Sequence, residues 1–129
     1  MSVCETEAVP AAASEGGPLS ELGREALEIA RSKGWEDERR TVGDLLALIH
    51  SEVSEALEAY RETGDVRQQS FGYSENLADK PEGVGAELAD VIIRVVHMGA
   101  VYGLPLDRLV RMKMDYNRYR PHRHGGKAL

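Results

Sequence analysis

Residues 41–62 read TVGDLLALIHSEVSEALEAYRE, and this stretch decides the fold class. Its apolar residues recur at spacings of three and four, which is the period of an amphipathic α-helix. Thr41 and Asp44 form a capping pair at its start, with Asp in the place of the usual Glu. No proline interrupts residues 42–62, so at ~1.5 Å per residue the stretch predicts one helix of roughly 32 Å.

Three further segments share the helical period. The predicted helices run from about Glu21, capped by Ser20, to Ser32, from Glu82 or Gly83 to Tyr102, and from Pro105 to Tyr119. Gly34 and Gly103 are stop signals, and Pro121 forbids continuation of the last helix. Residues 63–82 are rich in turn-forming residues and predict a long loop, and no strand pattern of period two occurs. We therefore predict an all-α fold in which four helices pack as a bundle.

Length and composition limit the class of protein. The chain has 129 residues, enough for one domain, which we assign to residues 18–129, with residues 1–17 as a disordered leader. The net charge of −6 argues against a general nucleic-acid binder. No apolar run of about 18 residues and no secretory signal is present, and the single Cys4 excludes an internal disulfide. A cytoplasmic location is expected.

Two pairs of acids carry the candidate chemistry. Glu52 and Glu55 project from one side of the helix over residues 42–62, and Glu87 and Asp90 from one side of the helix that ends at Tyr102. Glu52 and Glu87 fall inside the apolar stripes of their helices, where an unpaired carboxylate is costly. A cation is therefore expected between the helices. It is either an arginine, for which Arg94 is one candidate, or a divalent metal.

The ligand types favour a hard cation. Oxygen-only ligands suit Mg²⁺ or Mn²⁺. The Glu-x-x-His spacing of di-iron bundles is absent, because His50 precedes Glu52 by two residues. Zinc does not fit, since the only cysteine lies in the predicted leader.

The end of the chain is basic. Residues 111–129 carry six Lys or Arg and one acid, and Lys113, Asn117 and Arg120 share one side of the last helix. Such groups bind phosphate oxygens, although a solvated tail has the same composition. Trp35 either stacks on a nucleobase or packs in the core, and Tyr116 either reaches the site or packs in the bundle.

Three segments together resemble the MazG-like family of all-α nucleoside triphosphate pyrophosphohydrolases. They are LIHSEVSEALEAYR at 48–61, GVGAELADVIIR at 83–94 and KMDYNRYRPHRHGGK at 113–127. The resemblance covers about residues 20–127. The same superfamily includes dimeric dUTPases, dCTP pyrophosphatases and phosphoribosyl-ATP pyrophosphohydrolase. The loop between the two acid pairs is longer here than in many relatives, so the preferred base stays open.

The resemblance implies a four-helix bundle of the all-α NTP pyrophosphatase type. It also implies Mg²⁺-dependent hydrolysis of (deoxy)nucleoside triphosphates between the α and β phosphates, in a housecleaning role. The implied Mg²⁺ ligands, with Mn²⁺ as a substitute, and catalytic residues are Glu52, Glu55, Glu87 and Asp90. The implied substrate-binding residues are Lys113, Asn117, Arg120 and Lys127, to which we add Trp35 and Tyr116.

We expect a homodimer or homotetramer, because the helix that ends at Tyr102 is more apolar than one small protomer needs. A neighbouring copy then contributes residues to each site. No nucleic-acid polymer and no membrane is expected as a partner. Two alternatives stay open. One is an enzyme that acts on phosphoribosyl-ATP, and the other is a non-catalytic helical interaction protein.

Overall fold

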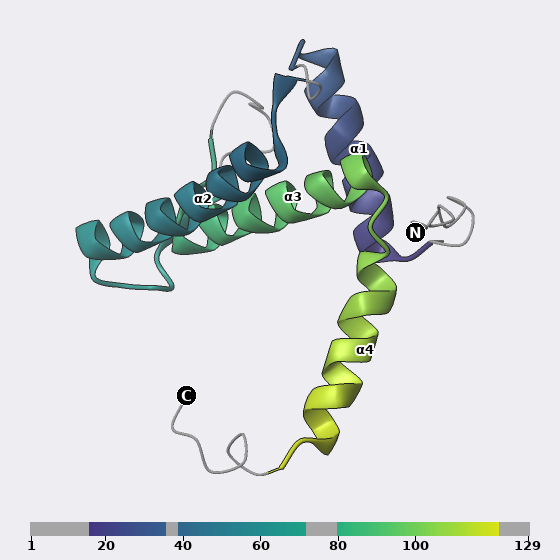
Figure 1. The fold of residues 1–129 in the computed structure, drawn as a ribbon. Coiled ribbons are helices and arrows are strands. Elements are labelled where there is room, and N and C mark those ends of the chain that lie inside the picture. The colour runs from purple at the N-terminus through teal and green to yellow at the C-terminus, as the bar shows by residue number, and fades with distance from the viewer. Residues whose placement is uncertain (1–15, 36–38, 72–79, 122–129) are drawn as a thin grey trace, which may run out of the picture.

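The computed structural model describes residues 16–35, 39–71 and 80–121 of the 129. Its elements are α1 (Pro18–Ser32), α2 (Val42–Thr63), β1 (Gln69–Ser70), β2 (Glu82–Gly83), α3 (Val84–Tyr102) and α4 (Leu106–Tyr119). The described chain is mostly helical, which confirms the predicted all-α class (Figure 1). The expectation of no strand is wrong in one place. β1 and β2 pair antiparallel, so the loop that the sequence predicts over residues 63–82 contains one strand within it and a second at its end.

α3 is the centre of the fold. It packs against α1 and along α2, whereas α4 contacts mainly α1 (Figure 1). Figure 1 shows α2 and α3 side by side and α4 pointing away from them. Within one chain, the fourth helix therefore does not close a bundle around α2 and α3.

α2 begins and ends where the sequence predicts. The Thr41 hydroxyl accepts a hydrogen bond from the Asp44 amide at 3.0 Å, and the Asp44 carboxylate accepts one from the Thr41 amide at 2.9 Å. This capping box pairs amides that the first helical turn leaves without partners. Gly64 ends the helix with a left-handed φ of 71°. The capping prediction is confirmed.

The start of α1 differs from the prediction. The helix begins at Pro18, so Ser20 lies inside its first turn and is not the cap. Asp107 at the start of α4 supplies the acceptor instead. Its carboxylate accepts hydrogen bonds from the amides of Leu19 and Ser20, both at 2.9 Å, and from the Ser20 hydroxyl at 2.8 Å. A side chain 88 residues away thus does what a local cap usually does.

The ionised form of Asp107 is favoured in the fold. Burial acts to raise the pKa of this carboxyl group. The hydrogen bonds from Leu19 and Ser20 and the nearby Arg24 outweigh burial, so the pKa lies below the ordinary 3.8. This anchor joins the first turns of α1 and α4.

Gly23 lets α1 approach α3 closely. A Cβ atom at this position would lie 2.5 Å from the backbone oxygen of Val96, which is closer than any real side chain allows. Gly23 and Val96 are both buried. The small residue therefore sets the distance between the two helices.

The core of one chain is small. Among the described residues, the buried hydrophobic ones are Ala30, Leu45, Ala56, Val84 and Val96. α4 has no buried residue. The apolar stripes that contain Glu52 and Glu87 are predicted to be buried along their whole length. Val53 on α2 and Leu88 and Val95 on α3 belong to these stripes but are exposed, because no element among the described residues covers them. This placement corrects the predicted core.

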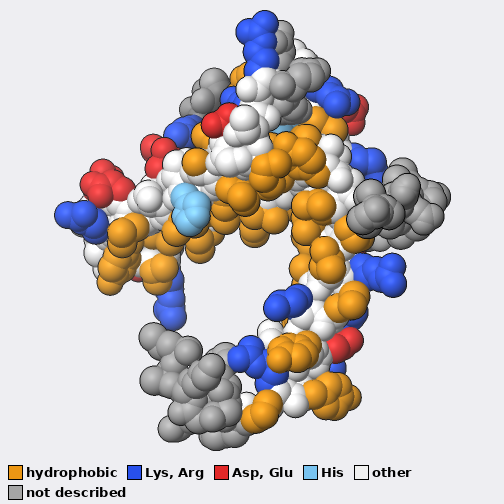
Figure 2. All heavy atoms as spheres, in the orientation of Figure 1, with side chains coloured by type: hydrophobic (Ala, Val, Ile, Leu, Met, Phe, Trp, Pro, Cys, Tyr) orange, Lys and Arg blue, Asp and Glu red, His pale blue; other side chains and the backbone are white. Residues whose placement is uncertain are grey.

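The exposed hydrophobic residues follow helical faces. On α2 they are Val42, Leu46, Val53, Leu57 and Tyr60; on α3 they are Leu88, Ile92, Ile93, Val95 and Tyr102. α4 adds Leu109, Val110, Met112, Met114, Tyr116 and Tyr119. Figure 2 shows hydrophobic side chains on both sides of the open space between the α2–α3 pair and α4. α2 and α3 therefore each carry a second apolar stripe besides the one they bury.

α3 and α4 begin one to two residues later than predicted. α3 begins at Val84 with Gly83 before it, and Pro105 precedes α4 instead of lying within its first turn. The predicted leader, apart from Gly16 and Gly17, and the end of the chain from residue 122 lie outside the described residues. None of the described helices has the length and apolarity that crossing a bilayer requires.

Candidate functional site

Glu52 is the only charged residue that the structure buries among the described ranges, with 8% of its surface exposed. It lies on the face of α2 that packs on α3, as its place in the apolar stripe predicts. A carboxylate in that position needs a cation or hydrogen-bond donors.

Three carboxylates meet at the α2–α3 seam. Glu52, Glu87 and Asp90 each present one oxygen within 4.8 Å of the others, and we call this set the acidic cluster. Glu87 and Asp90 are one turn apart on α3, which places them on the same side. Glu55 is exposed and lies outside this set, although the structure brings it near enough to act on the charge of Glu87.

Like charges make this cluster costly in the absence of a cation. The pKa of Glu87 is raised above its ordinary 4.5, first by burial and then by the carboxylates of Asp90 and Glu55. Lys80 opposes this effect in part, and Glu52 adds to it. A divalent cation would remove the repulsion. The donors are all carboxylate oxygens, so they fit Mg²⁺ or Mn²⁺ better than zinc.

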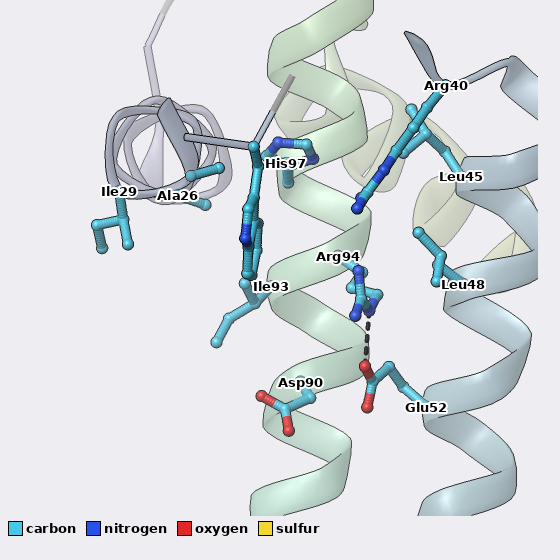
Figure 3. Close-up of a pocket in the computed structure, with 12 residues that line it drawn as sticks. Ala26, Ile29, Arg40, Leu45, Leu48, Glu52, Asp90, Ile93, Arg94 and His97 are labelled. Atoms are coloured by element: carbon cyan, nitrogen blue, oxygen red, sulfur yellow. Dashed lines mark hydrogen bonds and ion pairs between the residues drawn. The ribbon is translucent and has the colours of Figure 1, made fainter. Parts of the chain in front are cut away.

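Arg94 already supplies one cation. Its Nε donates a hydrogen bond to Oε1 of Glu52 at 2.6 Å (Figure 3). The Glu52 side chain is 10% exposed and the Arg94 side chain 30%. The sequence predicts either an arginine or a metal ion beside the carboxylates between α2 and α3. The structure provides the arginine and also keeps three carboxylates grouped beside it.

A pocket of about 370 Å³ opens next to the acidic cluster. Its apolar walls are Ala26, Ile29, Ala30, Leu45, Leu48 and Ile93, and its polar lining is Trp35, Arg40, Glu52, Asp90, Arg94 and His97. Figure 3 shows Arg40 reaching from the segment before α2 toward Arg94. This volume and mixed lining suit a small organic ligand with an anionic end.

Trp35 lies on the pocket wall, as a stacking role requires, but it is half exposed. The guanidinium of Arg40 lies 6.0 Å from the centre of its ring. Trp35 is therefore not packed in the core of a single chain. Arg40 and His97 are pocket residues that the sequence reasoning missed. His97 was detectable, since it follows Asp90 by seven residues on one helical face, whereas Arg40 lies in a link without a period.

The predicted phosphate-binding residues of α4 lie elsewhere in one chain. Tyr116 is exposed between Lys113 and Arg120, whose charged groups lie 6.0 and 5.7 Å from its ring centre. Arg120 also donates to Oδ1 of Asn117 at 3.3 Å. None of these residues lines the pocket, because α4 points away from α2 and α3 (Figure 1). Lys127 lies outside the described residues.

Comparison with known proteins adds no relative. No family model, no curated protein and no solved structure matches this chain. The function must therefore be argued from the acidic cluster, the pocket and the exposed faces.

Proposed function

We propose that the protein hydrolyses nucleoside or deoxynucleoside triphosphates between the α and β phosphates, with Mg²⁺, in a housecleaning role in the cytoplasm. One observation carries the proposal, namely that Glu52, Glu87 and Asp90 from two helices converge within 4.8 Å of one another. Clusters of carboxylate oxygens are typical of sites where Mg²⁺ meets phosphate. The resemblance to MazG-like enzymes names these three residues together with Glu55.

Each carboxylate has a proposed part. Glu52, Glu87 and Asp90 hold Mg²⁺, for which Mn²⁺ substitutes, and the ion when bound withdraws charge from phosphate oxygens and acidifies water. Glu55 lies beside Glu87 outside the acidic cluster, so its carboxylate is available to accept the proton of the attacking water. The pocket beyond Arg94 takes the nucleoside, with Trp35 as a stacking surface.

A homodimer or homotetramer is part of the proposal. The exposed apolar stripes of α2 and α3 and the exposed face of α4 support it, since an apolar surface of this extent is typical of an interface. Charge supports a second copy as the occupant. The basic groups of α4, Lys113 and Arg120, would complement the acidic α2–α3 pair of a neighbour. In that arrangement the bundle is completed between chains.

A second candidate function is a non-catalytic helical interaction protein. The ion pair between Arg94 and Glu52 favours it, because it satisfies the buried carboxylate without a metal. The exposed apolar stripes fit it equally well. An enzyme for phosphoribosyl-ATP differs from the main proposal only in substrate.

The test is pyrophosphate release with Mg²⁺ from the eight common NTPs and dNTPs, dUTP and phosphoribosyl-ATP. Glu87→Gln is expected to lower the rate by about 100-fold or more, because it removes a metal ligand. Glu58→Gln is the matched control. Glu58 is exposed on α2 and paired with Arg61 at 3.9 Å, so its loss is expected to change the rate less than about twofold. Equal release in both variants would overturn the assignment of the acidic cluster as the catalytic site, and no release by a folded protein would favour the interaction protein.

A further inference from the structure

The ion pair between Arg94 and Glu52 joins the acidic cluster to the pocket. Glu52 belongs to both, and Arg94 follows Asp90 by one helical turn on α3. The bond is short, 2.6 Å, and its acceptor is nine-tenths buried. The Arg94 guanidinium thus binds one of the three carboxylates that the proposed metal site needs.

Arg94 uses only part of its donor capacity in this bond. The hydrogen bond comes from Nε, and within residues 16–35, 39–71 and 80–121 the two terminal nitrogens donate to no other group. An arginine carries five N–H donors in a planar fork. Because Arg94 lines the pocket, its terminal nitrogens are available to a ligand there (Figure 3).

Two cations on one carboxylate oppose each other. A divalent ion that binds Glu52 is repelled by the guanidinium beside it, and the carboxylate charge is already partly neutralised. A phosphate group changes this balance. It adds negative charge beside the metal and offers oxygens that an arginine fork recognises.

We propose that Arg94 is a positioning residue that couples metal binding to phosphate binding, an inference that rests on the proposed function. Without a phosphate ligand, Arg94 holds Glu52 and keeps the affinity for a metal alone low. With a polyphosphate in the pocket, the terminal nitrogens of Arg94 pair with a phosphate oxygen and Glu52 turns to the metal. The site then loads metal and polyphosphate together.

The experiment measures binding of Mn²⁺ alone, by electron paramagnetic resonance, and of pyrophosphate in saturating Mn²⁺, by calorimetry. Arg94→Gln is expected to bind Mn²⁺ alone about five- to tenfold more tightly and pyrophosphate at least about tenfold more weakly. Arg61→Gln is the matched control, because Arg61 is an exposed arginine paired with a glutamate on α2. It is expected to leave both affinities unchanged.

Opposite shifts in the two affinities separate coupling from a structural role. A folded Arg94→Gln protein that loses affinity for both ligands overturns the inference and leaves the metal site standing. Absence of Mn²⁺ binding in the wild type and in Arg94→Gln alike removes the metal site itself, and with it the proposed function.

A second variant covers the case in which Arg94→Gln does not fold. Arg94→Lys keeps a positive charge beside Glu52 but cannot bond the carboxylate and a phosphate with one planar fork. It is expected to bind Mn²⁺ alone as the wild type does and to bind pyrophosphate more weakly. Wild-type affinity for both ligands in Arg94→Lys also overturns the inference.

Discussion

The α2–α3 pair and α4 differ in how far a single chain buries their side chains and gives them partners. The α2–α3 seam buries Glu52, gives it Arg94 as a partner and groups two more carboxylates beside it. α4 buries nothing and exposes six large hydrophobic side chains together with its basic residues. Both regions are regular helices, so the difference lies in what packs against them.

This difference distinguishes the site that one chain forms by itself from the surface that one chain leaves exposed. The acidic cluster is arranged by contacts within the chain, so it exists before any partner binds. The predicted phosphate contacts on α4 reach no such site in one chain. Substitutions in each region test this distinction, and they follow in order from the largest expected effect to the smallest.

Gly23→Ala is expected to cause the largest loss, because it affects the contact that holds α1 to α3. The new Cβ would meet the backbone oxygen of Val96 at 2.5 Å, so the helices must separate. We expect the free energy of unfolding to fall by about 2 kcal/mol in urea titrations. Gly43→Ala is the control. Its Cβ would meet only the Thr41 hydroxyl at 3.6 Å, and the variant should be stabilised by up to about 1 kcal/mol. Equal stability of the two variants would contradict the close approach.

The double variant Leu109→Gln with Met112→Gln tests the exposed face of α4. If a second copy covers that face, the dissociation constant of the oligomer should rise at least about tenfold, since two apolar side chains are lost from the interface. Light scattering over a range of protein concentrations measures it. Arg108→Gln, an exposed charge on the same helix, should leave association unchanged. A wild-type protein that is monomeric at all concentrations would refute the covered face.

Asp107→Asn tests the hydrogen-bonded anchor between α4 and α1. The ionised carboxylate is favoured in the fold, so it stabilises the protein above pH 3.8 and loses this effect as the pH falls through its lowered pKa. The variant should therefore melt at a lower temperature than the wild type at neutral pH, and the gap should close in acid. Glu28→Gln, which changes an exposed acid of α1, is the control. A gap that does not depend on pH would show that the charge of Asp107 is not what matters.

Glu87→Gln should have the smallest effect on stability and the opposite sign. In the metal-free protein the pKa of Glu87 is raised above 4.5, so its favourable contribution is complete below that pH and is lost as the pH rises through the raised pKa. The variant should gain less than about 1 kcal/mol at neutral pH relative to the wild type. Thermal melts in a chelator from pH 4 to pH 8 would show it. A loss of stability at neutral pH would mean that Glu87 has a favourable partner.

Local signals in the sequence accounted for α2 and for the burial of Glu52. The capping box at Thr41 and Asp44 is formed within four residues, so the sequence alone predicts the start of α2. Glu52 interrupts an apolar stripe, and the stripe alone requires it to face α3. Arg94 was a candidate for its partner because one helical turn separates it from Asp90.

The predictions that were wrong depend on contacts between residues far apart in the sequence. Ser20 was expected to cap α1 because no local signal reveals that Asp107 bonds the amides there. The direction of α4 depends on the short connection after Gly103, and its apolar residues cannot tell a partner helix from a neighbouring chain. Arg40 was missed because its link has no period that would assign it a face.

The bond from Asp107 to the start of α1 also bears on the order in which the chain is completed during synthesis. Residues 19 and 107 are 88 positions apart, so the first turn of α1 leaves the ribosome long before its acceptor exists. Domains fold as their segments emerge, and contacts between distant segments form late. α1 is therefore finished only when α4 begins, and a nascent chain that stops before residue 107 keeps a frayed first turn in α1.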